Sequence, residues 1–271
     1  MIVVPTSPAA HIAFDLLAWS SGLALGYALH RWRLRDASMR LAGVAGRGYF
    51  ASLALGAAGG AWLAGSLNTL SSASPALSHS VVGALAGAIA GVEIYKRLRG
   101  IKGSTGGSFV GPFALGIVIG RLGCLFTGLP DRTYGSPTDL PFAVDLGDGI
   151  GRHPVQLYES AAMALFLAIY LTGLARRAPW AMQRGFYALC LAYGVQRFAW
   201  EWLKPYPPVL GPLNVFHIVS GGLAIYGLVY WRADLARASR AQDRALPVPR
   251  PDDEPVRDLL GAGAGQGDRR G

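Results

Sequence analysis

Seven stretches of about 20 mostly apolar residues follow one another along this chain of 271 residues and constrain its fold more than any other feature. They lie near residues 11–30, 48–67, 81–95, 109–128, 157–175, 185–203 and 215–231. A helix needs roughly 20 apolar residues to cross the hydrocarbon core of a bilayer. The pattern therefore predicts an all-α integral membrane protein with about seven transmembrane helices.

Composition and glycine spacing agree with lipid as the main solvent. Apolar residues make up 52% of the chain and charged residues only 15%, which is unlike a soluble domain. A soluble bundle of seven helices would need polar faces, and most of the windows have none. Gly83, Gly87 and Gly91 recur at every fourth position of the third window, a spacing that predicts close contact between helix backbones.

The basic residues indicate which side of the membrane each loop occupies. A net charge of +9 is compatible with nucleic-acid binding, but the basic residues follow alternate windows, at 31–47, 96–102, 176–184 and 232–244. The positive-inside rule places these segments in the cytoplasm. We therefore expect the N-terminus outside, the C-terminus inside and no nucleic-acid partner.

Two segments differ from the apolar windows. Residues 129–156 form one long loop on the outer side with many turn residues, and the run at 140–145 predicts a short strand or an extended lid. From residue 233 the chain becomes rich in Pro and Gly with mixed charge, which is typical of disorder. The expected organisation is a transmembrane domain over 1–232 and a disordered cytoplasmic tail over 233–271.

Cysteine and histidine usage gives no reason to expect a cofactor or a metal. Cys124 and Cys190 lie in apolar windows, so we expect small buried side chains rather than a disulfide. The remaining candidates lie at helix ends or at the membrane interface, and no function is assigned to them: His11, His30, His79 and His217.

Four charged residues lie in the outer halves of the windows: Arg121, Glu159, Arg197 and Glu201. A charge deep in the bilayer costs at least roughly 2.5–3.5 kcal/mol, so such charges are expected to pair or to act. Arg197 and Glu201 are four residues apart and can pair on one helical face, and a purely structural salt bridge is one interpretation. Two arginines facing one cavity also require an anion between them, either a carboxylate or a lipid phosphate, which arginine binds in a bidentate manner.

His153 stands just before the fifth window, where Pro154 fixes the backbone ahead of a helix. Histidine exchanges protons near neutral pH. From chemistry alone the residue is a general acid or base, a donor to a headgroup, or only an interfacial side chain.

Three motifs resemble those of the prolipoprotein diacylglyceryl transferase family. They are Gly-Arg-Leu-Gly at 120–123 with Tyr-Gly at 134–135, Arg-His-Pro-Val-Gln-Leu-Tyr-Glu at 152–159, and Tyr-Gly-Val-Gln-Arg-Phe-Ala-Trp-Glu at 193–201. Their order, their spacing and the expected topology resemble the family over about residues 80–231. The middle motif is the most specific of the three.

The resemblance implies that the diacylglyceryl group of phosphatidylglycerol is transferred to the lipobox cysteine thiol of a preprolipoprotein. The implied partners are phosphatidylglycerol, preprolipoprotein signal peptides and membrane lipid. Glycerol phosphate would leave, and the site would face the periplasm from the bacterial inner membrane. The implied catalytic residues are Arg121, Arg197, Glu159, Glu201 and His153. The implied substrate-binding residues are Arg121, Arg152, Gln156, Tyr158 and Arg197.

The chain departs from the family pattern at two places. Cys124 and Thr127 stand where the family has amides, and the family's His-Gly-Gly motif, whose histidine is a proposed base, is absent from 81–91. The phosphate-binding inference is therefore better supported than the proton-transfer inference. The alternatives are a phospholipid-dependent transferase with another acceptor, a paralogue that only binds lipid, and a transporter, which the lack of internal repeats opposes.

Overall fold

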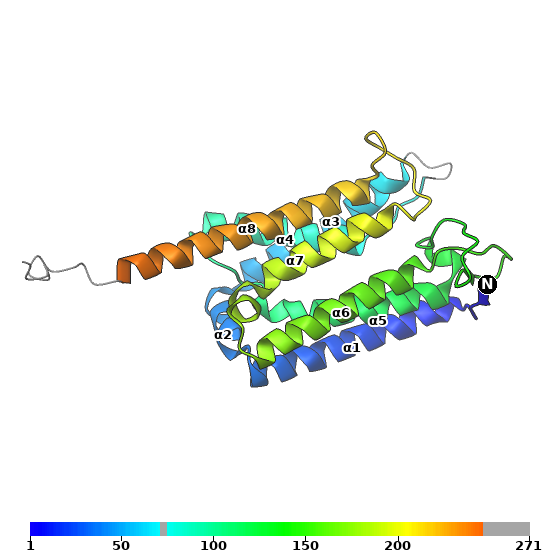
Figure 1. Cartoon of the computed structure of the whole chain (residues 1–271). Coiled ribbons are helices and arrows are strands. Elements are labelled where there is room, and N and C mark those ends of the chain that lie inside the picture. Colours follow the sequence, from blue (N-terminus) through cyan, green and yellow to red (C-terminus); the bar gives the residue numbers. More distant parts are fainter. Residues whose placement is uncertain (71–74, 246–271) are drawn as a thin grey trace, which may run out of the picture. The chain divides into compact units, whose positions relative to one another are not determined.

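The computed structural model describes residues 1–70 and 75–245, and the described chain is mainly helical (Figure 1). The chain divides into two compact units, Met1–Asp234 and Leu235–Gly271, and all site residues discussed below belong to the first. The long helices are α1 (Pro8–Trp32), α3 (Arg47–Thr69), α4 (Val81–Leu98), α5 (Val110–Thr127), α6 (Val155–Ala175), α7 (Pro179–Glu201) and α8 (Val215–Ala245). The shorter elements are β1 (Ile2–Val3), α2 (Arg35–Val44), η1 (Gly107–Phe109), η2 (Leu129–Asp131) and β2 (Val144–Asp145).

Each of the seven apolar windows is a helix, which confirms the all-α prediction at the level of secondary structure. Among the described residues, four helical segments are long and apolar enough to cross a membrane: Pro8–Trp32, Arg47–Thr69, Gly107–Thr127 and Val155–Ala175. α4 is shorter and carries Glu93, Lys96 and Arg97 near its end. A helical membrane protein is thus supported, while the number of seven spans stays a prediction.

The surface of α1 is suited to lipid rather than to water. Leu16, Trp19 and Leu23 are exposed, Leu23 by 77%. A continuous apolar face of this kind is unfavourable in water, whereas the bilayer core solvates it, and the helix satisfies its own backbone hydrogen bonds.

Helices α5, α6 and α7 form a group in which each contacts the other two, because α5 packs against α6, α6 against α7 and α5 against α7. α1 packs on the other side of α5 and lies beside it in Figure 1. α7 and α8 approach closely at Gly194 and Gly227, where an added Cβ would press on the backbone of the facing helix. Side chains from α5, α6 and α7 can therefore come together at the same position along the three helices.

Glycine also mediates the contact between α3 and α4. An added Cβ on Gly83, Gly87 or Gly91 of α4 would press on a backbone carbonyl of α3. The prediction that these glycines permit close backbone contact is confirmed. We call this contact the glycine seam.

The seam predicts opposite results for two adjacent glycines of α3. Gly60→Ala is expected to lower the free energy of unfolding by about 1–3 kcal/mol, because its methyl group would overlap the backbone of Gly83 and Gly87. Gly59→Ala serves as the matched control, since nothing lies within 4 Å of the added atom. Thermal unfolding in detergent measures both, and equal midpoints for the two variants would contradict the seam.

The long loop contains a strand at the place where a strand or a lid was predicted. β2 pairs in parallel with β1, and the backbone N–H of Ile2 donates to the carbonyl of Ala143 at 2.7 Å. The carboxylate of Asp145 accepts hydrogen bonds from the backbone N–H groups of Gly147, Asp148 and Gly149. The pairing thus ties the loop to the start of the chain.

The prediction of a disordered tail is wrong for its first residues, 233–245. α8 continues to Ala245, so residues 233–245 are helical. The helical pattern persists because no Pro or Gly interrupts it before Pro247. The rest of the predicted tail, residues 246–271, lies outside the described residues.

Candidate functional site

Arg121 of α5, Glu159 of α6 and Arg197 of α7 meet inside the first unit. Arg121 Nε lies 2.5 Å from Glu159 Oε2, and Arg197 donates to the other oxygen, Oε1. The Glu159 side chain is fully buried. The expectation that an anion separates the two arginines is confirmed, and that anion is a carboxylate.

Glu201 and Lys204 complete this group. Arg197 pairs with Glu201 at 3.1 Å, as their four-residue spacing predicted. The buried Lys204 Nζ lies 2.6 Å from Glu159 Oε1 and 3.7 Å from Glu201 Oε2. We call Arg121, Glu159, Arg197, Glu201 and Lys204 the charge cluster.

The charge cluster contains three cations and two carboxylates, so it has one excess positive charge. Burying an excess charge in an apolar medium is costly unless an opposite charge is supplied. Arg197 Nε is also buried with no hydrogen-bond partner among the described residues. The arrangement is therefore suited to an anionic ligand.

The first turn of α8 is fixed against the charge cluster. Asn214 Nδ2 donates to Glu201 Oε1 at 3.2 Å. Asn214 and His217 cap the helix reciprocally, since Asn214 Oδ1 accepts from the His217 backbone N–H and His217 Nδ1 accepts from that of Asn214. Val215 N–H donates to Asn68 Oδ1 at 3.1 Å, which connects the turn to α3. The helix terminus adds partial positive charge.

Gln156 lies on α6 three residues before Glu159, on the same face of the helix. Its side chain is only 1% exposed, and neither of its amide atoms has a hydrogen-bond partner among the described residues. Buried polar atoms are nearly always paired. An amide in this state is consistent with the substrate-binding role that the resemblance implied.

Arg152 belongs to the long loop rather than to the charge cluster. Its guanidinium donates to both carboxylate oxygens of Asp148 at 2.7 and 2.8 Å and lies 5.0 Å from the ring centroid of Tyr134. The hydrogen bond from Arg152 lowers the pKa of Asp148, and the same hydrogen bond raises the pKa of Arg152. The structure thus gives Arg152 a role in shaping the loop, and substrate binding by it stays a prediction.

His153, just before α6, lies beside Tyr158 in the first turn of that helix. The Tyr158 hydroxyl is 3.5 Å from His153 Nδ1, and the Tyr158 ring is 5.2 Å from that of Trp200 on α7. In the described part of the chain, no hydrogen bond or ion pair joins His153 to the charge cluster. The catalytic role of His153 therefore stays a prediction.

The two cysteines are free thiols in different surroundings. Cys190 is completely buried in α7, as predicted. Cys124 lies at the end of α5 with its sulfur 3.8 Å from an Arg121 nitrogen. For Cys124 the prediction of a simple apolar side chain is wrong, because α5 turns it toward polar groups.

Comparison with known proteins identifies relatives for most of this chain. A model of the prolipoprotein diacylglyceryl transferase family matches residues 17–233. Curated relatives named phosphatidylglycerol–prolipoprotein diacylglyceryl transferase include those of Methylococcus capsulatus, 34% identical over 58% of this chain, and Solidesulfovibrio magneticus, 36% identical over 52%. The same name is given to a protein of Methylocella silvestris that is 30% identical over 82% of this chain and 90% of its own length.

The matches differ in how much of each relative they cover. The matched part spans 62% of the Methylococcus protein and 54% of the Solidesulfovibrio protein. No solved structure gives a significant match.

Proposed function

Because the chain belongs to the prolipoprotein diacylglyceryl transferase family, we propose that it transfers the diacylglyceryl group of phosphatidylglycerol to a cysteine thiol of a preprolipoprotein. The thiolate attacks the carbon of the diacylglycerol unit that is bonded to the phosphate oxygen. The carbon–oxygen bond breaks, and glycerol phosphate leaves with the bonding electrons. The observation that supports this proposal best is the buried charge cluster with its excess positive charge.

In this proposal Arg121 and Arg197 bind the phosphate and stabilise the charge that grows on it in the transition state. Glu159 shares its two oxygens among three cations, so its role is to orient them. Lys204 adds a third cation close to the same carboxylate. Glu201 fixes Arg197 from the other side.

Attack by the acceptor thiol also requires removal of its proton. An ordinary thiol is only partly ionised at neutral pH. For His153 we propose one of two roles, acceptor of the thiol proton or ligand of the lipid headgroup. The Tyr158 ring lies against the His153 ring. Gln156 is proposed to donate to the phosphatidylglycerol headgroup.

The proposed location is the bacterial inner membrane, with the site toward the periplasm. The positive-inside rule applied to the basic segments supports this orientation. Reporter fusions after Arg99 and Arg177 are expected to report the cytoplasm, and a fusion at Asp145 the periplasm. The opposite pattern would place the charge cluster on the wrong side for this substrate.

The direct test is complementation of a bacterial strain depleted of its own transferase. We expect expression of this chain to restore lipid modification of lipoproteins, and the Arg121→Ala variant to fail at equal membrane abundance. A purified assay with phosphatidylglycerol vesicles and a lipobox peptide should add one diacylglyceryl group to the peptide, detected by mass. A peptide with serine in place of the cysteine is the matched negative control.

Two results would separate the alternatives. Phosphatidylglycerol binding without transfer to the peptide would favour a lipid-binding paralogue or another acceptor. Transport of a solute with no modified peptide would favour the transporter.

A further inference from the structure

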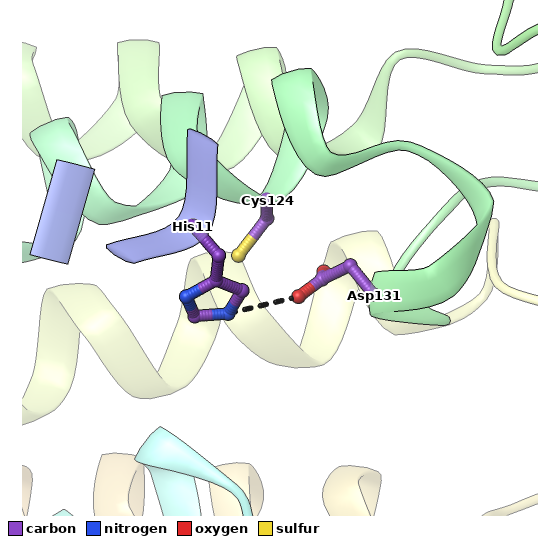
Figure 2. A group of neighbouring side chains, drawn as sticks. All are labelled: His11, Cys124 and Asp131. Carbon is purple, nitrogen blue, oxygen red and sulfur yellow. Dashed lines mark ion pairs between the residues drawn. The ribbon is translucent and has the colours of Figure 1, made fainter. Parts of the chain in front are cut away.

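His11, Cys124 and Asp131 form a second polar group, outside the charge cluster. His11 lies in the first turn of α1, Cys124 in the last turn of α5, and Asp131 at the end of η2. Figure 2 shows the three side chains turned toward one another. We propose that they bind a single divalent cation of the zinc class through one nitrogen, one sulfur and one oxygen ligand.

The ligand atoms are already close enough for one ion. His11 Nε2 lies 3.1 Å from Asp131 Oδ1, and all three ligand atoms lie within 4.8 Å of one another. Zinc–ligand distances of about 2.0–2.3 Å in a tetrahedron place neighbouring ligand atoms about 3.3–3.7 Å apart. The thiol therefore has to move by on the order of 1 Å at most to close the triangle around an ion.

Each ligand has a further polar contact of the kind that orients ligands around metals. His11 Nδ1 lies 2.9 Å from Asp15 Oδ2, so this carboxylate can accept the Nδ1 proton and leave Nε2 free to coordinate. The hydroxyl of Thr133 donates to the second oxygen of Asp131. Arg121 NH1 lies 3.8 Å from Cys124 Sγ, so the sulfur also has a polar neighbour.

The backbone around the three ligands is held by direct contacts between α1 and α5. The Phe14 and Phe126 rings stack with centroids 5.5 Å apart. The backbone N–H of Ser7 donates to the carbonyl of Phe126 at 2.8 Å. The ligands from α1 and α5 are thus held in place before any ion binds, and η2, which carries Asp131, packs against α5. Such preorganisation favours affinity.

The donor set selects the class of ion. Magnesium and calcium prefer oxygen ligands alone, whereas nitrogen, thiolate and carboxylate together suit zinc. Three protein ligands leave a fourth position for water or substrate. The other interpretation is a hydrogen-bonded group without metal, in which both nitrogens of His11 carry protons toward Asp131 and Asp15 and the Cys124 thiol donates to Asp131.

Metal binding by the full-length protein, purified in detergent without a polyhistidine tag, tests the proposal independently of transfer activity. After treatment with a chelator, we expect the protein to take up about one equivalent of Zn²⁺. With Co²⁺ as the probe, a thiolate-to-cobalt absorption band is expected in the near ultraviolet. Cys124→Ser should abolish that band, and Cys190→Ser, the matched control in α7, should retain it.

Asp15→Asn provides a milder variant, because it keeps all three ligands and changes only the partner of His11. Its affinity for Zn²⁺ is expected to fall by about 10–100-fold with unchanged stoichiometry. It tests the site even when a ligand variant fails to fold, as judged by size-exclusion chromatography. A folded parent that takes up no Zn²⁺, a cobalt band that survives in Cys124→Ser, or full affinity in Asp15→Asn would each overturn the proposal.

Discussion

Replacing Arg121 or Arg197 by alanine is expected to reduce diacylglyceryl transfer by about 10²–10³-fold while the protein stays in the membrane. Each arginine lies against Glu159 and retains nitrogens that do not contact this carboxylate, so its loss is expected to remove donors that the proposed phosphate ligand would use. Lysine should restore little activity, because it lacks the planar fork of arginine. The measurement is turnover of a lipobox peptide in phosphatidylglycerol vesicles at matched protein amounts.

Arg184→Ala is the matched control for the arginine variants. Arg184 is a buried arginine of α7 like Arg197, but it pairs with Asp234 at 2.9 Å and lies outside the charge cluster. Its turnover should remain close to that of the parent. Near-normal transfer by Arg121→Ala or Arg197→Ala would show that the charge cluster does not bind the phosphate.

Glu159→Gln is expected to cause the largest loss of stability among substitutions in the charge cluster. The change leaves Arg121, Arg197 and Lys204 buried beside one another with only Glu201 as a counter-charge. Removing one partner of a buried ion pair costs about 3–5 kcal/mol. Thermal unfolding in detergent should therefore show a much lower midpoint than for the parent.

Glu93→Gln is the control for the loss of a buried carboxylate. Glu93 faces a single cation, Lys96, at 2.7 Å, and is 18% exposed. Its variant should lose much less stability, because one cation rather than three loses a partner. If Glu159→Gln unfolds at the temperature of Glu93→Gln or above it, the charge cluster is not held together by Glu159.

The parts of the fold that depend on local pattern could be predicted from the sequence. Runs of apolar residues at helical length gave all seven long helices, and the glycine spacing in α4 gave the glycine seam. The pairing of β1 with β2 could not be predicted, because two-residue strands far apart in the chain have no periodicity of their own. The extension of α8 to Ala245 was missed because composition changes before the helix ends.

In the site, too, a contact between residues close in the sequence could be predicted, whereas a contact between distant residues could not. The pair of Arg197 with Glu201 follows from a four-residue spacing. No role in the site was predicted for Lys204, although its three-residue spacing from Glu201 was a usable signal. The contact of His11 with Asp131 joins α1 to η2, which are far apart in the sequence, and no local signal in either segment indicates it.

The glycine seam restricts where the proposed substrate, a lipid with two acyl chains, is expected to enter the unit. Where the backbones of α3 and α4 touch directly, no layer of side chains remains that could rotate aside. The two helices are therefore expected to move together as one rigid pair. Lipid entry is expected where two helices meet through side chains that can change rotamer. α6 and α7 meet through side chains, the rings of Tyr158 and Trp200 at 5.2 Å beside His153, but the buried ion pair of Glu159 with Arg197 also joins these two helices and would have to break for them to separate.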